Sequence, residues 1–390
     1  MLDEQISVVV AAPPMRIGGT QQHLLHILPA LAKRGFAITA VLLEAGGPLE
    51  QPLRDGGVQV LAPALHLPRP LRTLNQARLI RRTIRQTNAA IVHAFLSEPS
   101  IAAAVAQITL LDDRPCLIHG RRSLAFYSNK HRLAQKIEVA AHRLCGALVG
   151  NSSAVVQELI VEARSPDKVC LIHNGIPLGE AILPAERQAA RLRFGIPADA
   201  LVMTLVANLH IYKGHQNLLV ALAYVKDRLP DAWRLLLPGR DSGEGKALAQ
   251  SIQQLGLTQN VLMLGEWPNS REPYAAADIG LLVSHTEGFS NSLIEGMAAG
   301  LPMIATRVGG NIDAIDNGTT GLLVAPQSPD DLASAIMKLV KSVDLRDRLG
   351  HAARIKALDK FSLQNCIDRY ERLWRGFAGK QSGRPADWLF

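Results

Sequence analysis

The chain has 390 residues, 48% of them hydrophobic and only 4% aromatic, so it is long enough for two domains of ordinary size with mainly aliphatic cores. Its four cysteines are widely spaced and form no C-x-x-C pair, which argues against a disulfide framework or a zinc site and indicates reduced thiols. The formal net charge of +8 comes mostly from residues 1–175, which hold 19 basic and 12 acidic residues, against 23 and 22 in the rest.

This charge favours an anionic membrane surface or a phosphate-bearing partner over nucleic acid, because aromatic residues are few and no nucleic-acid-binding module is recognisable. We expect neither a signal peptide nor a transmembrane helix, since the first residues are acidic and no apolar run reaches about 18 residues. The predicted location is therefore cytoplasmic.

In chain order, the first half alternates short apolar runs, which predict buried strands, with segments of helical spacing. The predicted strands are residues 7–12, 36–43, 90–95, 115–120, 147–151 and 169–172, and the predicted helices are residues 20–33, 76–87, 132–145 and 152–162. This alternation predicts a doubly wound α/β domain, which we expect to end at Pro177.

Two stretches of this half are candidates for contact with an anion. Gly18 and Gly19 separate the first strand from the first helix, where backbone can approach a phosphate, although a tight turn also explains them. The region from Arg69 to Arg85 contains six arginines and no acid. It is either a solvated helix face or a surface for anionic lipid, where each arginine contributes about 1 kcal/mol.

Histidines and arginines mark two strand ends. His93 and His119 each stand at the carboxyl end of a predicted strand, where a histidine is usually structural. Arg121 and Arg122 follow in a predicted loop, and they could bind a phosphate or carboxylate through bidentate hydrogen bonds. A plain surface loop is the alternative.

The second half repeats the alternation. The predicted strands are residues 202–207, 233–237, 261–264, 279–283, 303–306 and 321–324, and the predicted helices are residues 185–193, 216–229, 248–255, 292–299, 330–340, 344–358 and 361–377. A second doubly wound domain follows from this pattern.

The most informative stretch runs from Ser284 to Gly310 and reads as loop, helix and strand after a buried strand. The first N–H groups of its helix, at residues 290–293, favour an anion. Glu287 and Glu295 lie on either side and could accept hydrogen bonds from sugar hydroxyls. A phosphate cradle between two carboxylates suits a nucleotide-sugar, whereas the alternative is a capped surface helix with solvated glutamates.

The string EGFSNSLIEGMAAGLP, which starts at Glu287 and continues as MIATRVGG, resembles the E-x7-E signature of retaining glycosyltransferases of family 4 (group 1). Gly296 stands where alanine is commoner. The segment NLHIYKG from Asn208 resembles the family's G-R-L-x-x-x-K-G, with Asn208 in place of the usual arginine. Gly18-Gly19 resembles the family's GG-x-E loop, with Gln21 in place of the acid.

Two further landmarks extend the resemblance over nearly the whole chain. His119-Gly120 resembles the strand-end histidine that reaches towards the donor, and Asn174 to Pro177 resembles the N-G-I-D element, with proline in place of the acid. The resemblance implies the GT-B fold, in which two doubly wound Rossmann-like domains face a central cleft. It assigns residues 1–177 to the acceptor, residues 178–360 to the nucleotide-sugar, and residues 361–390 to a helix that crosses back to the first domain and a mobile tail.

The implied activity is transfer of a sugar, with retention, from a nucleoside diphosphate sugar to an acceptor hydroxyl. The acceptor is expected to be lipid-linked or a polysaccharide of the bacterial cell envelope, with peripheral membrane contact. No metal or cofactor is implied, and a UDP-sugar is favoured over a GDP-sugar. A nucleotide-sugar 2-epimerase, a phosphorylase of related fold and an inactive donor-binding scaffold are the alternatives.

The resemblance also implies roles for single residues. Lys213 and Asn208 would hold the diphosphate, Glu295 the ribose, and Glu287 the donor sugar. The catalytic residues would be Glu287, Lys213 and His119, and the acceptor would be bound by Arg121 and Arg122. The full set of predicted donor contacts is Gly18, Gly19, Asn208, Lys213, Gly214, Arg240, Trp267, Glu287, Gly288, Phe289, Ser290, Asn291, Ser292, Leu293 and Glu295.

Overall fold

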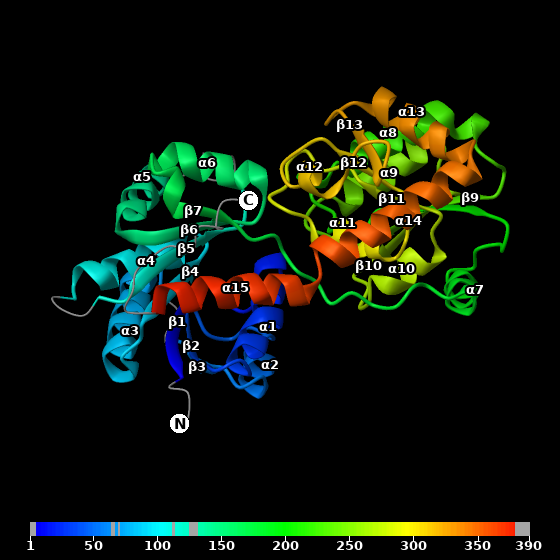
Figure 1. Cartoon of the computed structure of the whole chain (residues 1–390). Coiled ribbons are helices and arrows are strands. Elements are labelled where there is room, and N and C mark those ends of the chain that lie inside the picture. Colours follow the sequence, from blue (N-terminus) through cyan, green and yellow to red (C-terminus); the bar gives the residue numbers. More distant parts are fainter. Residues whose placement is uncertain (1–4, 64–66, 69–70, 111–113, 125–131, 379–390) are drawn as a thin grey trace. The chain divides into compact units, whose positions relative to one another are not determined.

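The computed structural model describes residues 5–63, 67–68, 71–110, 114–124 and 132–378 (Figure 1). They divide into two compact units. Unit 1 comprises Met1–Pro177 with Leu363–Phe390, and unit 2 comprises Leu178–Ser362. The predicted mobile tail at residues 380–390 lies outside the described residues.

Within the described residues, unit 1 contains a parallel sheet of seven strands in the order β3-β2-β1-β4-β5-β6-β7. Their bounds are β1 Ile6–Ala12, β2 Phe36–Leu42, β3 Gln59–Leu61, β4 Ile91–Phe95, β5 Cys116–Arg121, β6 Cys145–Gly150 and β7 Val169–Leu171. The central strand β1 pairs in parallel with β2 and β4. The order therefore runs outward in both directions from β1 and β4, as in a doubly wound sheet.

Both faces of this sheet are buried, because the apolar residues of β1 alternate between two cores. Val8 and Val10 pack into one core with α1 (Gly19–Ala32), α2 (Glu50–Asp55) and α15 (Leu363–Ala378). Val9 and Ala11 pack into the other with α3 (Leu71–Thr87), α4 (Ser97–Ile108) and α6 (Ser153–Ala163). Continuous apolar strands of this kind are typical of parallel sheets covered by helices on each side.

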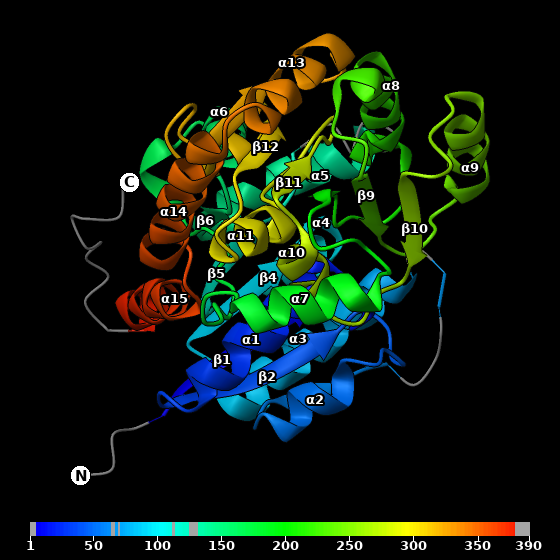
Figure 2. The ribbon, with the colours of Figure 1, turned by 90° about the vertical axis from the view of Figure 1, so that its right-hand side faces the viewer.

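Helix α15 returns to unit 1 and packs on α1 and β4, as predicted (Figures 1 and 2). Its apolar face carries Tyr370 and Trp374, and the Trp374 ring meets Phe36 edge-on at 5.2 Å between centroids. On its outer side, Asp368 and Glu371 each pair with Arg34 at 2.6 Å. The amphipathic spacing of residues 361–377 therefore predicted this helix correctly, although it begins at Leu363.

Unit 2 repeats the winding with six described strands in the order β10-β9-β8-β11-β12-β13. Its strands are β8 Leu201–Thr204, β9 Trp233–Pro238, β10 Val261–Gly265, β11 Ile279–Leu282, β12 Met303–Thr306 and β13 Gly321–Val324. Its helices are α7 Pro184–Arg193, α8 His215–Val225, α9 Gly245–Gln254, α10 Arg271–Ala276, α11 Asn291–Ala298, α12 Asn311–Ala314, α13 Pro329–Val340 and α14 Val343–Lys360. The predicted α/β fold class is confirmed.

Some elements were not predicted or were predicted with other bounds. Helices α2 and α4 and the short edge strand β3 were missed. The segment predicted as one helix, 132–145, is α5 (Arg132–Ala141) followed by a 3-10 turn at His142–Leu144, and Cys145 already begins β6. None of the described helices is long and apolar enough to cross a bilayer.

Candidate functional site

The candidate site of unit 2 lies at the carboxyl ends of β8 and β11, the neighbours from which the strand order runs in opposite directions. Doubly wound sheets bind ligands at such a switch point. The loops that leave the two strands are packed together, because His285 N donates to Tyr212 O at 2.7 Å. A Cβ at Gly214 would lie 2.1 Å from Val283 O. This packing places the predicted residues of the two loops side by side.

Lys213 and Glu287 form an ion pair there, with 2.5 Å between Nζ and Oε1. Ser284 Oγ donates to the same Oε1 at 2.7 Å, and Thr306 Oγ1 donates to the Ser284 carbonyl at 2.6 Å. The side chains of Lys213 and Glu287 are 16% and 10% exposed, so the pair is largely desolvated but still reaches solvent. Burial alone would lower the pKa of Lys213, but Glu287 and Tyr212 raise it above its ordinary value, so the lysine stays charged.

Ser284 and Thr306, which orient Glu287, were not predicted. No sequence signal marks them, because their contacts exist only once the loop folds over β12.

The loop before α11 is held from both ends. Ser290 caps the helix, with its Oγ accepting from Leu293 N at 3.4 Å and lying 3.0 Å from Ser292 Oγ. Gly310 N donates to Gly288 O at 3.0 Å, and a Cβ at Gly310 would lie 2.5 Å from that oxygen. The first-turn N–H groups of α11, which no intrahelical carbonyl can accept, therefore start from a fixed backbone.

Three other predicted residues lie on the same loop and helix. Phe289 is buried and packs on Phe361, with 5.3 Å between ring centroids, so it supports the loop from inside. Asn291 is the first residue of α11. Glu295 follows one turn later, and burial raises its pKa although a hydrogen bond with Ser270 opposes this.

Asn208 and Arg240 follow β8 and β9 and meet through the backbone. Arg240 N donates to Asn208 Oδ1 at 3.2 Å, and Leu209 N donates to Arg240 O at 2.9 Å. A Cβ at Gly239 would lie 1.9 Å from Ala207 O, so this approach requires glycine. The carbonyl of the Asn208 amide is thus engaged, and its NH2 group is the part that would face a ligand.

Trp267 is not joined to these residues by any described contact. Its indole Nε1 donates to Glu272 at 3.1 Å, its ring packs on Phe194 at 5.2 Å between centroids, and Arg193 lies over the ring at 5.2 Å. The side chain is held against α7 and α10, so a role in donor binding stays a prediction.

In unit 1, Gly18 and Gly19 begin α1, as expected. A Cβ at Gly18 would lie 2.7 Å from Gln21 Oε1, and Gln21 Nε2 donates to Pro14 O at 3.1 Å. Gln21 therefore closes the loop onto itself.

The expectation that Arg121 lies in a loop was wrong. Strand β5 extends to Arg121, whose side chain is only 7% exposed and pairs with Glu138 at 3.1 Å and Glu162 at 2.8 Å. His119 lies in the same cluster, with Nε2 at 3.2 Å from Glu138 and Nδ1 hydrogen-bonded to Ser100. Sequence reasoning missed this network because its acids come from two later helices, α5 and α6.

His119, Glu138 and His142 could present ligand atoms to a metal, since these atoms all lie within 4.8 Å of one another. However, the Arg121 guanidinium approaches the same Glu138 oxygen and already supplies the positive charge that a cation would bring. Burial would raise the pKa of Glu138, but His119 and Arg121 together hold it far below its ordinary value.

Arg122 and His93 are also buried. Arg122 donates to Asn174 Oδ1 at 2.6 Å, and His93 accepts a hydrogen bond from Trp374 at 3.0 Å and stacks on Phe95. These contacts explain both side chains structurally, so acceptor binding by Arg121 and Arg122 remains an untested prediction.

The basic surface is smaller than expected. Arg69 lies outside the described residues, and Arg72 is paired with Glu44 and Glu98. Three arginines of α3 are exposed, namely Arg78, Arg82 and Arg85.

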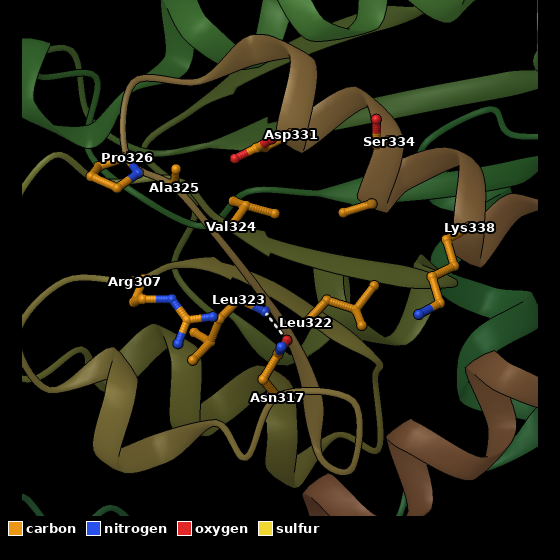
Figure 3. Close-up of a pocket in the computed structure, with 11 residues that line it drawn as sticks. Arg307, Asn317, Leu322, Leu323, Val324, Ala325, Pro326, Asp331, Ser334 and Lys338 are labelled. Carbon is orange, nitrogen blue, oxygen red and sulfur yellow. Dashed lines mark hydrogen bonds between the residues drawn. The ribbon is translucent and has the colours of Figure 1, made fainter.

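A cavity of unit 2 of about 530 Å³ lies elsewhere, between β13 and α13 (Figure 3). Apolar side chains of β13 form its floor, and Arg307 and Lys338 lie at opposite sides of it. None of the predicted donor contacts lines this cavity.

Comparison with known proteins covers almost the whole chain. Residues 17–180 match the family Glycosyltransferase Family 4, and residues 186–356 match Glycosyl transferases group 1. A D-inositol 3-phosphate glycosyltransferase of Streptomyces scabiei is 32% identical over 226 residues, which are 55% of this chain and 50% of that relative. The chain thus spans about half of that relative's length.

Two solved structures share the fold. Alr3699/HepE of Anabaena in complex with UDP is 20% identical, with a TM-score of 0.84 over 95% of this chain and 100% of that chain. WaaG, a glycosyltransferase involved in lipopolysaccharide biosynthesis, is 19% identical, with a TM-score of 0.75 over the same shares.

Proposed function

The chain belongs to the group 1, family 4 glycosyltransferases, and on this premise we propose that it moves a sugar, with retention, from a nucleoside diphosphate sugar to an acceptor hydroxyl. Unit 2 would bind the donor and unit 1 the acceptor. The observation that carries the proposal is the Lys213–Glu287 pair at the switch point of unit 2, directly before the N-terminus of α11.

This arrangement suits departure of a diphosphate. The lysine charge and the first N–H groups of α11 would stabilise the negative charge that develops on the leaving group. Asn208 would add a neutral hydrogen bond, which is about half as strong as a charge-assisted one. Lys213 therefore carries most of this stabilisation.

Glu287 is better suited to orienting the donor sugar than to attacking it. Its Oε1 already accepts hydrogen bonds from Lys213 and Ser284, both of which reduce its nucleophilicity. Among the described residues, Oε2 has no such donor and can accept from a sugar hydroxyl. This favours front-face transfer, in which the leaving phosphate takes the proton of the acceptor hydroxyl, and no metal is needed for that step.

For the donor we favour a UDP-sugar, because a neighbour of the same fold holds UDP. For the acceptor we favour a lipid-linked or polysaccharide glycan of the bacterial envelope, met at the membrane surface through the exposed arginines of α3. A soluble inositol phosphate is the second candidate, which the names of the relatives favour.

Thermal unfolding in the presence of UDP, GDP or ADP, without added metal, tests the donor site. We expect UDP to raise the thermal unfolding midpoint of the wild-type protein and of Lys341→Ala, a control at an exposed lysine of the same unit, but not that of Lys213→Ala.

Product analysis by NMR of the anomeric proton then decides between retention and inversion. A Lys213→Ala variant that keeps its UDP shift and turnover would refute this role, and epimerised donor without acceptor would favour the 2-epimerase.

A further inference from the structure

Unit 1 carries a charged cluster at its own switch point, between β1 and β4. Arg16 lies in the loop after β1, Glu44 follows β2, and Glu98 lies in the first turn of α4 after β4. Arg72, in the first turn of α3, sits between the two glutamates. The four residues are far apart in sequence and meet only because parallel strands end at one edge of the sheet.

The cluster has a planar, bidentate geometry. Arg72 donates from Nε and Nη2 to the two oxygens of Glu98, both at 2.7 Å, and from Nη1 to Glu44. Thr73 Oγ1 donates to Glu98 at 2.9 Å, and Arg16 lies 3.3 Å from the other oxygen of Glu44. The side chains of Arg72 and Glu98 are 22% and 15% exposed, so this ion pair is largely buried but still reaches solvent.

Two features of the surrounding structure hold the Arg72–Glu98 pair in place. Gln76, one turn after Arg72 and fully buried, donates to Ala12 O at 3.0 Å and to Val41 O at 2.9 Å, which ties α3 to the ends of β1 and β2. Leu96, directly before α4, has a φ of +72°, a costly conformation for leucine. Strained backbone of this kind concentrates at binding sites.

Stability alone does not account for the cluster. Ion pairs that reach solvent contribute little to folding, because ordering two long side chains offsets the attraction. Here three ion pairs share two arginines and two glutamates beside a strained residue. A preordered binding surface explains this combination better.

We propose that Arg72, Glu98 and Glu44 bind the hydroxyl groups of an uncharged acceptor ring, a sugar or cyclitol, with Arg16 at the rim. The two positive and two negative charges cancel, which disfavours a lone phosphate. Nη1 and Nη2 of Arg72 each carry a second N–H that can donate to a hydroxyl, and a carboxylate oxygen accepts more than one hydrogen bond. The proposal rests on the proposed function, and it locates the acceptor at a site other than Arg121 and Arg122.

Saturation-transfer NMR on the full chain with UDP tests this, with myo-inositol, D-glucose and N-acetyl-D-glucosamine as probes, and broadening of the 31P signal of inorganic phosphate reports whether phosphate binds. We expect ring signals from at least one sugar or cyclitol with the wild-type protein and with the control Arg54→Gln, an exposed arginine of helix α2 in the same unit. Arg72→Gln and Glu98→Gln should weaken binding about tenfold or more, because each loses a charge-assisted hydrogen bond. Arg72→Lys should also bind weakly, since it keeps the charge but loses the bidentate geometry.

Three results would overturn the proposal: no ring signal from the folded wild-type protein, equal ring binding by Arg72→Gln and Glu98→Gln, or binding of phosphate alone. Thermal unfolding with UDP tests the proposed function independently of ring binding. If UDP does not stabilise the wild-type protein, the donor assignment falls. If UDP stabilises it but the Arg72 variants bind the ring normally, only the acceptor site falls.

Discussion

Gly214 has a φ of +74°, between Lys213 and helix α8, and a Cβ there would lie 2.1 Å from Val283 O. Gly214→Ala therefore adds a backbone clash to the conformational cost of about 1–2 kcal/mol. We expect a loss of stability clearly above that range, together with loss of the UDP-dependent thermal shift, measured by urea unfolding and thermal unfolding.

Gly195→Ala is the matched control, because Gly195 has a φ of +64° and nothing within 4 Å of the added Cβ. It should lose only about 1–2 kcal/mol and keep the UDP shift. Equal losses in the two variants would show that the close approach to Val283 does not position Lys213.

Arg121 provides a second test at this scale. Arg121→Met would leave the buried carboxylate of Glu138 and that of Glu162 without their shared cation, and breaking such a buried pair costs about 3–5 kcal/mol. We expect a loss of that order in urea unfolding, with little change for Arg78→Met. A stable Arg121→Met variant that loses acceptor binding would instead favour the original assignment of Arg121 to the acceptor.

These residues differ in how far the sequence could predict them. Lys213 and Glu287 could be predicted as site residues because their neighbours in sequence form recognisable strings, and their position at strand ends follows from the local pattern. The burial of Arg121 and the pairing of Arg72 could not be found this way. Their acidic partners come from other helices and loops, and only the folded sheet brings them together.

Among the elements, α15 allows the strongest prediction, because it comes from the far end of the chain and completes, with α1 and α2, the core on one face of the unit 1 sheet. Trp374 is fully buried, packs on Phe36 and donates to His93. Trp374→Ala should cost about 3–5 kcal/mol. We expect this loss of folding free energy in unit 1 only, with UDP binding by unit 2 unchanged.

Thiol labelling reports the unfolding of unit 1 alone, because all four cysteines lie in that unit. Burial raises the pKa of Cys145, Cys170 and Cys366 to about 12, so these thiols stay unreactive until unit 1 opens. Faster labelling of Trp374→Ala, without loss of the UDP shift, is the expected result. Unchanged labelling would mean that α15 contributes little to unit 1.

The elements missed by sequence reasoning share a physical cause. Helix α4 is rich in alanine and buried between neighbours, so it has no polar stripe that reveals helical spacing. Strand β3 has three residues and lies at the sheet edge, which is too short for a period of two to show. Elements with long, one-sided apolar patterns, such as α15, were found without difficulty.

At the scale of the whole molecule, the two units share one winding order, and each has an ion-paired cluster at its switch point. In unit 2 the pair is Lys213 with Glu287, and in unit 1 it is Arg72 with Glu98 and Glu44. A cluster with a net positive charge would favour binding of a phosphate, whereas a cluster whose charges balance would favour binding of neutral hydroxyl groups. Unit 2 adds the N–H groups of α11 to its balanced pair, which is why we assign the diphosphate to unit 2 and the neutral ring to unit 1.

The units also differ in how acid should affect them. In unit 1, burial lowers the pKa of His23 and His93 far below the ordinary 6.5, and burial with His119 and Arg121 lowers that of His142 to about 3. In unit 2, burial and Lys213 lower the pKa of His215 to about 4. Below about pH 6.5 the unfolded chain binds protons that these folded histidines do not, so stability falls as the pH falls.

Each such histidine contributes a slope of about 1.4 kcal/mol per pH unit once the pH is well below 6.5. We therefore expect unit 1, which holds three of these four histidines, to lose stability more steeply than unit 2 between pH 6 and pH 4.5. Urea midpoints from pulse labelling with dithiodipyridine report unit 1, and the 19F NMR signal of the buried Trp233, in protein labelled with 5-fluorotryptophan, reports unit 2. His142→Gln should make the slope of unit 1 shallower, whereas parallel slopes in the two units would contradict the assignment of neutral, buried histidines to unit 1.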